Sequence, residues 1–152
     1  MADLDWCKKR KGGIKIVEPN DNLSKEYLEN AEETLKVLKG VEGKSNMWLA
    51  VFKYYFEYFC VYSILMKIGI KCEIHDCTIE VCRFLEKEKI IPFGFTEILE
   101  GDKDIRIDNQ YYLKNRNVEI NHDILRDFLL AIKEVLNNLN YDLIKEIRGK
   151  LE

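Results

Sequence analysis

The sequence predicts an all-α protein, an antiparallel up-and-down helical bundle of four to six helices, and three observations support this prediction. With 47% hydrophobic and 34% charged residues, the 152-residue chain is too apolar to be disordered, and its length fits one domain. Two prolines and eight glycines are too few for the turns of a small β-sandwich. Apolar residues recur every three or four positions in long stretches separated by short loops, as in packed amphipathic helices.

The chain begins with a segment that shows neither helical nor strand periodicity. Residues 1–20 carry the basic cluster Lys8-Lys9-Arg10-Lys11 followed by two glycines, and we interpret them as an extended N-terminal arm of a single domain, 1–152. The first helix is expected after Ser24, because the next apolar residues form one stripe: Tyr27, Leu28, Ala31, Leu35 and Leu38. Gly40 and Gly43 end it.

The second helix is the most apolar element of the chain. From Lys44 to Ile68 there is no glycine or proline, and Gly69 ends the stretch. Aromatic and aliphatic side chains cover most of its circumference, so it must be buried on several sides. Two placements satisfy this requirement, the centre of a bundle or a subunit interface.

Four further helices follow from the same kind of pattern. Asp76 is a plausible N-cap for the third helix. Gly101 is either tolerated inside the fourth helix or marks a break in it. The expected ranges of these four helices are 77–85, 96–114, 124–139 and, for a short C-terminal helix, 142–151.

The cysteines indicate a reducing compartment. There are five, an odd number, and no signal peptide precedes them, so we expect a cytoplasmic protein with buried free thiols and no disulfide framework. Cys72, His75, Cys77 and Cys82 lack the spacing of a zinc site, because Cys77 and Cys82 lie five positions apart on one helix and point away from each other. No metal or cofactor is expected.

Charge and hydropathy exclude two classes of partner. The longest charge-free apolar run, Tyr58 to Met66, is too short to span a bilayer, so no membrane partner is expected. The net charge of −3 excludes the broad positive field of a nucleic-acid coat protein. A nucleic-acid role must then depend on a local cluster, and the best candidate lies between Lys103 and Arg116.

This polar cluster has two interpretations. Lys103, Arg106 and Asn109 share one side of the expected fourth helix, with Asp108 on a neighbouring edge and the phenols of Tyr111 and Tyr112 beyond them. One interpretation is a solvated helix face with intrahelical ion pairs, and the other is a binding site made by Lys103, Arg106, Asp108, Tyr111 and Tyr112. Asn121 and His122 fit the first turn of the fifth helix, and His75 fits the turn before the third.

The order of several motifs resembles that of a known superfamily. They are the aromatic run Lys53–Phe59, the Gly69-Ile70 turn leading to His75, and Arg106 followed by Tyr111-Tyr112. From about Trp6 to Val135 the chain resembles the HEPN superfamily, and most closely its small archaeal and bacterial members. The resemblance implies a helical homodimer, often encoded beside a minimal nucleotidyltransferase as a toxin–antitoxin pair. Many such proteins are metal-independent endoribonucleases with an Arg-x4–6-His motif, whose arginine holds the scissile phosphate.

The motif can be placed on this chain in two registers. Arg116 and His122 match it literally, just before the expected fifth helix. Helix order instead places Arg106 at the arginine and Tyr111 or Tyr112 at the histidine, and tyrosine, with its pKa near 10, is a poor proton shuttle. The resemblance therefore leaves two functions: a subunit that binds a nucleotide, RNA or a partner protein beside a nucleotidyltransferase, slightly favoured, and a toxin-like endoribonuclease using an Arg/His pair.

Overall fold

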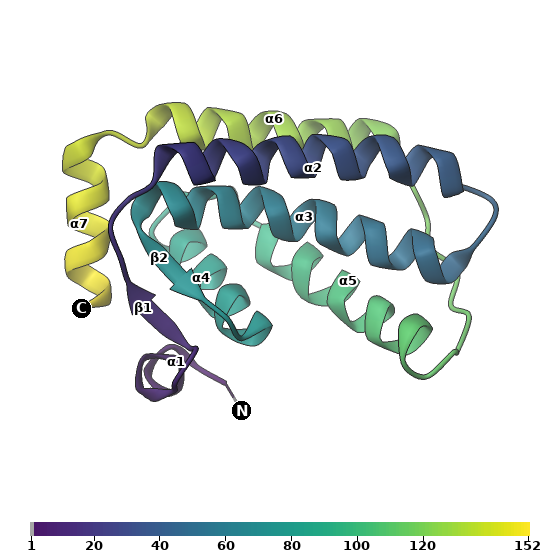
Figure 1. Cartoon of the computed structure of the whole chain (residues 1–152), viewed down its shortest axis with the longest axis horizontal. Helices are drawn as coiled ribbons and strands as arrows, with labels where there is room; N and C mark the ends of the chain where they lie inside the picture. The colour runs from purple at the N-terminus through teal and green to yellow at the C-terminus, as the bar shows by residue number, and fades with distance from the viewer. Residues whose placement is uncertain (1) are drawn as a thin grey trace.

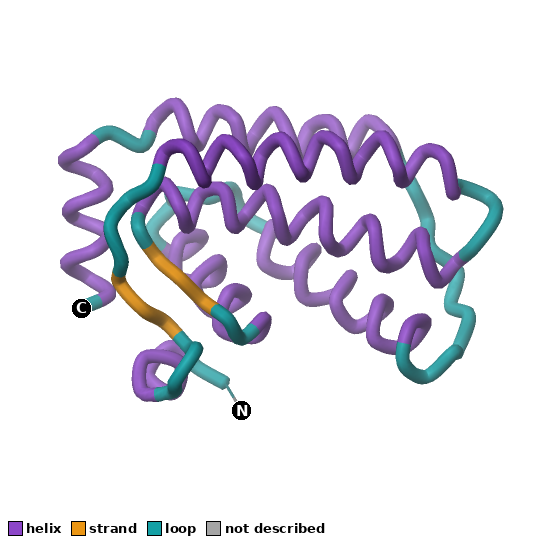
Figure 2. Tube along the Cα trace, in the orientation of Figure 1, coloured by secondary structure: helices purple, strands orange, loops and turns teal. Residues whose placement is uncertain are grey.

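The computed structural model describes residues 2–152 and is mostly helical, at 71%. Seven helices and one two-stranded antiparallel hairpin make up this part of the chain (Figures 1 and 2). In chain order the elements are α1 (Leu4–Lys9), β1 (Ile14–Ile16), α2 (Asp21–Val41), α3 (Asn46–Ile68), β2 (Ile70–Cys72), α4 (His75–Lys87), α5 (Phe95–Gln110), α6 (His122–Asn138) and α7 (Tyr141–Leu151). The helical class is as the sequence predicted, and the hairpin is an addition to it.

The long helices α2, α3 and α6 lie roughly along one axis, and α5 is inclined to them (Figure 1). In Figure 1, α2, α3, α5 and α6 alternate in direction along the chain, α7 crosses one end of them, and the short α4 lies between β2 and α5. The most extensive packing is that of α2 against α3, and α5 and α6 also pack against α3. The C-terminal α7 coincides, within one residue, with the expected short helix 142–151.

Helix α3 is the centre of this arrangement. Ser45 caps its first turn by accepting a hydrogen bond from the Trp48 N–H at 3.2 Å, and Gly69 ends it in the left-handed conformation. Of its 23 residues, 15 are buried within the chain itself. Of the two placements open from the sequence, the structure therefore shows the bundle centre.

The same helix satisfies the length and composition of a membrane span. Within the described chain it is the one helix that does so, and 78% of its most apolar stretch is buried against the other elements. Core helices of helical bundles share these properties. The expectation that no segment meets a membrane stays a prediction.

The N-terminal segment differs from the expected extended arm. Asp3 caps α1 by accepting a hydrogen bond from the Trp6 N–H at 2.8 Å, and β1 pairs antiparallel with β2, with Ile14 opposite Cys72. A six-residue helix and a three-residue strand are too short to show a period, and the strand's partner lies more than 50 positions away, so neither could be predicted locally.

A disulfide joins α1 to α4, which corrects the expectation that the cysteines are free. Cys7 is bonded to Cys77 across 70 positions, and both are buried. Cys60, Cys72 and Cys82 are buried free thiols, as expected, and burial raises the pKa of each. Cysteine spacing carried no sign of this pair, because it depends on the folding of residues 4–9 against α4.

We predict that the disulfide stabilises the docked position of α1. Replacing both cysteines in Cys7→Ser/Cys77→Ser should lower the free energy of unfolding by about 2–4 kcal/mol, because the bridge closes a long loop in the unfolded chain. Urea unfolding under oxidising conditions measures this. Cys60→Ser, which removes a buried free thiol, controls for the loss of sulfur. With reductant present the wild type also lacks the bond, so its stability should approach that of the double variant. An equally large difference in unfolding free energy with and without reductant would contradict the role of the bond.

Several helix boundaries differ from the expected ones. Asn20, not a residue near Ser24, caps α2, and Ser24 is buried, donating its hydroxyl to the Ser63 carbonyl at 2.7 Å. α4 begins at His75 without a side-chain cap, so the N-cap expected at Asp76 is wrong. α5 tolerates Gly101 and ends at Gln110, four positions early, because Asn109 binds the backbone of Arg116 and reverses the chain.

Candidate functional site: an arginine, a histidine and three tyrosines

Five side chains from three helices meet where α3, α4 and α5 adjoin. They are Tyr54, Tyr55 and Tyr58 of α3, His75 at the start of α4, and Arg106 of α5, and we call them the arginine site. The helical period places the three tyrosines on one side of α3, next to the first turn of α4. Gly69 and the short β2 return the chain so that His75 lies against these rings.

Arg106 is a buried cation without an anion. Only 7% of its surface is exposed, and its guanidinium lies 4.7 Å from the centre of the Tyr54 ring and 5.5 Å from that of Tyr55. Its one side-chain hydrogen bond is a long one of 3.4 Å to the Tyr55 hydroxyl, and its Nε has no partner. Among residues 2–152 no carboxylate forms an ion pair with it. Contacts with aromatic faces stabilise the charge but leave its N–H donors available.

His75 lies flat against the tyrosine rings. Its ring centre is 4.4 Å from that of Tyr58 with an interplanar angle of 18°, and its Nδ1 is 2.9 Å from the Tyr54 hydroxyl. Burial, followed by the nearby Arg106 and Lys103 cations, lowers the pKa of this histidine below its ordinary value of 6.5. The imidazole is therefore neutral near pH 7. Because Tyr54 engages Nδ1, Nε2 is the nitrogen that remains for a ligand.

Tyr54 and Tyr58 stay protonated. Burial raises the pKa of Tyr54 and of Tyr58 above the ordinary value of 10. The Tyr58 hydroxyl is 3.2 Å from that of Thr78, so it is held inside the protein. Tyr55 is only half buried and is thus the ring of this group closest to solvent.

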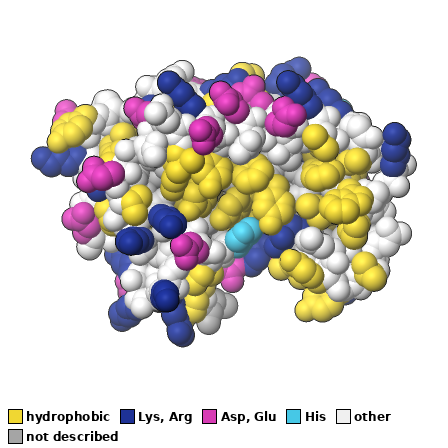
Figure 3. All heavy atoms as spheres, in the orientation of Figure 1, with side chains coloured by type: hydrophobic (Ala, Val, Ile, Leu, Met, Phe, Trp, Pro, Cys, Tyr) yellow, Lys and Arg dark blue, Asp and Glu magenta, His cyan; other side chains and the backbone are white. Residues whose placement is uncertain are grey.

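The edge of the site carries further charge. Lys103, one turn before Arg106, forms an ion pair with Asp76, the residue after His75. A cavity of about 310 Å³ opens beside this pair and is lined by Asp76, Arg83, Glu100 and Lys103 among others. In Figure 3 a histidine lies at the surface beside a band of hydrophobic side chains and next to basic ones, above an indentation in the outline of the molecule. The site thus lies at the surface while its arginine is buried.

This arrangement suits an anionic, planar ligand. A guanidinium with free donors forms strong, often bidentate hydrogen bonds to phosphate or carboxylate. Neighbouring tyrosine faces offer stacking surface for an aromatic ring. A neutral imidazole beside them can accept or donate one proton near neutral pH.

The structure brings together some of the residues that the sequence proposed for the site and separates others. Tyr111 lies 5.9 Å from the Arg106 guanidinium, measured to its ring centre, so the structure brings these two proposed residues together, and the motif register that pairs them stays a prediction. Arg116 instead forms an ion pair with Asp108 at 2.8 Å, which Lys114 joins at 3.3 Å. Tyr112 is exposed and has the Lys114 ammonium over its ring at 5.7 Å.

His122 lies in a different environment from Arg116. Its Nε2 is 2.8 Å from a carboxylate oxygen of Glu42, at the end of α2, and Asn121 caps α6 beside it, as expected for the first turn of that helix. The literal motif therefore consists of two exposed residues bound to different carboxylates. Its role in a site stays a prediction.

The histidine that accompanies Arg106 is His75, which the sequence indicated only weakly. It lies 31 positions before Arg106, so no local Arg-x4–6-His spacing could link the two. The available signal was the aromatic run of α3 together with the Gly69-Ile70 turn, which returns the chain to those aromatic residues.

Searches against protein-family models, curated proteins and solved structures found no significant match to this chain.

A second polar cluster links α3 to α5, and its central carboxyl group, that of Glu57, is buried. Lys53 is 3.0 Å from a carboxylate oxygen of Glu57 and also pairs with Asp102. Burial, with Asp102 nearby, raises the pKa of Glu57 well above its ordinary value, and the Oε1 atom of Glu57 has no partner. One ammonium is shared between two carboxyl groups, and the buried Glu57 holds its proton more tightly than a free glutamate does.

We predict that Glu57 makes the fold less stable as pH rises. Above pH 4.5 the unfolded chain releases this proton while the folded chain retains it, so stability falls with rising pH up to the folded pKa. Glu57→Gln should therefore gain stability relative to the wild type as pH rises from about 5 to about 7.5. Urea unfolding at both pH values measures it, with exposed Glu33→Gln as the control. Parallel stability curves for wild type and Glu57→Gln would show that Glu57 is ionised when folded.

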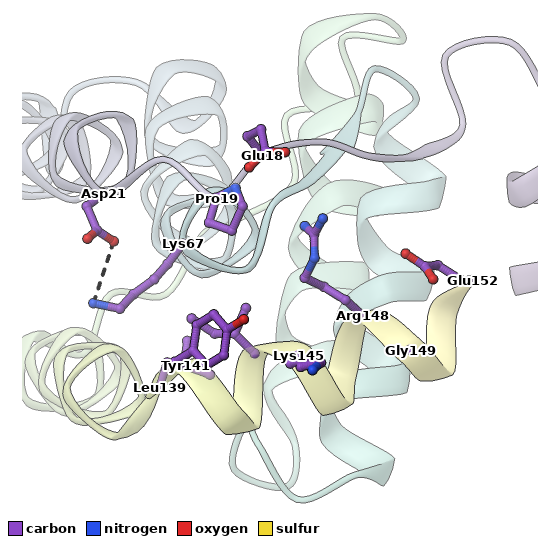
Figure 4. A pocket seen from close by; sticks show the side chains of 11 residues that line it. Glu18, Pro19, Asp21, Lys67, Leu139, Tyr141, Lys145, Arg148, Gly149 and Glu152 are labelled. Atoms are coloured by element: carbon purple, nitrogen blue, oxygen red, sulfur yellow. Dashed lines mark ion pairs between the residues drawn. The ribbon is translucent and has the colours of Figure 1, made fainter.

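A cavity of about 670 Å³ lies between α7 and the segment leading into α2 (Figure 4). Both signs of charge surround it, with Lys67 3.9 Å from Asp21. Arg148, the arginine of this cavity, is already hydrogen-bonded within the protein. Its Nη1 donates to the carbonyls of Val17 at 2.6 Å, Ile68 at 2.9 Å and Gly69 at 3.1 Å. These bonds join α7 to the end of α3, so Arg148 has a structural role. Among the described residues no group of three or more His, Cys, Asp or Glu is placed to hold a metal.

Proposed function

We propose that this chain is a HEPN-like RNA- or nucleotide-binding subunit whose arginine site receives a phosphate on Arg106. The observation that carries the proposal is the buried guanidinium of Arg106, which has an unpartnered Nε and no carboxylate within ion-pair distance in the described chain. Burying an unpaired charge is costly, and a bound anion would compensate for it. Phosphate is an anion that arginine binds especially well.

The surroundings of Arg106 favour a nucleotide over a simple anion. Tyr55 is half buried, and Tyr111, 5.9 Å from the guanidinium, is 64% exposed, so both present ring surface near the expected phosphate. A base stacked on such a ring adds affinity whatever its identity. Nε2 of His75 is available to hydrogen-bond a ribose or phosphate oxygen.

Partners form part of the same proposal. We propose a homodimer that works beside a minimal nucleotidyltransferase, as the resemblance to HEPN proteins implies. Because α3 is buried within its own chain, a dimer would use other surfaces. The exposed apolar residues after α5, Tyr111, Tyr112 and Leu113, are the nearest to the arginine site.

Equilibrium binding tests the proposal. Titration of the wild-type protein into a 5′-labelled single-stranded RNA, followed by fluorescence anisotropy, should give saturable binding that uridine monophosphate competes away. Uridine, which lacks the phosphate, should compete much more weakly, because Arg106 would have no anion to bind. Equal competition by nucleoside and nucleotide would contradict a phosphate on Arg106.

One observation also supports catalysis as a second candidate function, namely metal-independent RNA cleavage. His75, a member of the arginine site, is neutral near pH 7, which is what a general base acting on an RNA 2′-hydroxyl requires. In this scheme Arg106 would stabilise the negative charge that develops on the phosphate. The pair is Arg106 with His75, in place of Arg116 with His122.

If the chain cleaves RNA, His75→Ala should lower the cleavage rate by about 100-fold or more, because general acid–base catalysis contributes at least that much. The assay is cleavage of single-stranded RNA in EDTA, with His122→Ala as the matched variant of the only other histidine. A large loss in His122→Ala with full activity in His75→Ala would instead support the literal motif of Arg116 and His122.

A further inference from the structure

The N-terminal module concentrates positive charge in a chain that is otherwise acidic. Residues 8–15, Lys-Lys-Arg-Lys-Gly-Gly-Ile-Lys, carry five positive and no negative charges, whereas the whole chain has a net charge of −3. The rest of the chain therefore sums to −8. Lys71 of β2, next to Lys15 in the hairpin register, adds a sixth cation. We call these six residues the basic patch: Lys8, Lys9, Arg10, Lys11, Lys15 and Lys71.

The charges of the basic patch are largely unpaired. In the described part of the chain, only Lys71 has an ion-pair partner, Glu73 at 3.2 Å. All but Lys8 are exposed, and Figure 3 shows the Lys and Arg side chains gathered at the lower left, where Figure 1 places α1, β1 and β2. A cavity of about 340 Å³ is lined by four of them together with Gly12 and Gly13. Exposed lysines elsewhere in the described chain, such as those of α2, also lack ion pairs, so the patch is distinguished by its density, with five cations and no carboxylate in residues 8–15.

An aromatic ring accompanies the cations. The Arg10 guanidinium lies over the Trp6 ring at 4.7 Å from its centre, and Trp6 is half buried on α1. Cations interleaved with an aromatic ring are typical of surfaces that follow a nucleic-acid backbone. The helix dipole of α1 accounts for Lys8 and Lys9 at its C-terminal end, but not for Arg10, Lys11, Lys15 or Lys71.

The backbone that carries the basic patch is bonded to the segment that leads into the arginine site. The Gly12 carbonyl accepts hydrogen bonds from the N–H groups of Glu73 at 2.8 Å and Ile74 at 3.1 Å, and Ile74 directly precedes His75. The Cys7–Cys77 disulfide fixes α1 to the first turn of α4 on the same side. The module that carries the patch, which the sequence alone suggested was an arm, is thus joined to the start of α4, where His75 lies.

From these observations we infer that the ligand of the arginine site is an RNA strand whose backbone continues across the basic patch. This inference rests on the proposed function and specifies its substrate class, an oligonucleotide in place of a mononucleotide. One phosphate occupies Arg106, and the phosphates beyond it contact Arg10, Lys11, Lys15 and Lys71. The cluster between Lys103 and Arg116 is then one end of the binding surface and not the whole of it.

The test compares two probes on two triple variants of the full, oxidised chain. The probes are uridine monophosphate and a single-stranded oligouridylate of roughly 12 nucleotides. Lys9→Gln/Lys11→Gln/Lys15→Gln removes three charges from the patch, and Lys25→Gln/Lys36→Gln/Lys39→Gln removes three exposed charges from α2 as the matched control. Binding is measured between about 50 and 200 mM salt.

We expect the patch variant to bind the oligonucleotide at least about tenfold more weakly, with the slope of log K against log salt reduced by about 2. Its affinity for uridine monophosphate should match that of the wild type, and the α2 variant should bind both probes normally. An unchanged salt slope in the patch variant, or an equal loss in the α2 variant, would overturn the inference.

Two further results separate this inference from the proposed function. If Arg106→Gln loses uridine monophosphate while the patch variant binds oligonucleotide like the wild type, the inference fails and the proposed function stands. If oligonucleotide binding needs the patch but not Arg106, the strand does not enter the arginine site and the inference also fails. Patch-dependent binding to phosphatidylglycerol vesicles without binding to RNA would assign the patch to a membrane surface and overturn it.

Discussion

Arg106→Gln should lower the affinity for uridine monophosphate and for single-stranded RNA by about 30-fold or more. A charge-assisted hydrogen bond contributes roughly 1.5–3 kcal/mol, and the guanidinium can offer a phosphate two of them. Arg106 has free donors and no carboxylate partner in the described chain. The loss of affinity would therefore report its bonds to the ligand and not the loss of an internal ion pair. Isothermal titration calorimetry measures the loss for both probes.

Two comparisons make the result specific. Arg126→Gln removes an exposed arginine of α6 that pairs only with Asp123, and it should leave binding unchanged. Arg106→Lys keeps the charge but loses the planar fork, so it should bind with intermediate affinity. The Arg106→Gln variant should remain folded, because it loses cation–π contacts but also removes an unpaired buried charge. Binding at wild-type strength by this folded variant would contradict the proposed function.

Gly69→Ala should be among the most destabilising single substitutions in the chain, by about 2–5 kcal/mol. Gly69 has φ of +90°, a left-handed conformation that alanine adopts at a cost, and it ends α3. An added Cβ would also overlap the backbone carbonyl oxygen of Val17 and the guanidinium of Arg148, which donates to the Gly69 carbonyl. The residue therefore joins the end of α3, the strand β2 and α7. Urea unfolding measures the loss.

Gly101→Ala is the matched control for this prediction. Gly101 lies inside α5 with open space around it, so an added methyl group meets nothing and alanine favours the helix. This variant should gain about 0.5–1 kcal/mol. If Gly69→Ala were as stable as the wild type, the close approach at the end of α3 would not be a constraint on the fold.

The long elements could be predicted from sequence because each depends on its own residues. The apolar stretch from Lys44 to Ile68 and the Gly69 stop reproduce α3 within two residues. The hairpin, α1 and the disulfide could not, because each is stabilised by a partner distant in sequence, such as Cys77 for Cys7. The end of α5 was missed because one side chain, that of Asn109, binds the backbone of Arg116.

The candidate site was partly predictable for the same reason. Arg106 and Tyr111 were proposed from one helix, and they do lie near each other. Tyr54 and Tyr58 were interpreted only as packing residues, and their contact with His75 depends on how β2 and α4 return to α3. A local Arg-x4–6-His pattern favoured His122, which the structure places against Glu42 instead.

The two histidines of the chain provide the most direct test of the arginine site. Their ring resonances can be followed by long-range ¹H–¹⁵N NMR while uridine monophosphate is added to the wild-type protein. We predict that the His75 resonances shift with saturation and that those of His122, bound to Glu42, stay in place. Shifts of His122 with an unchanged His75 would contradict the account and would assign the ligand to the literal motif.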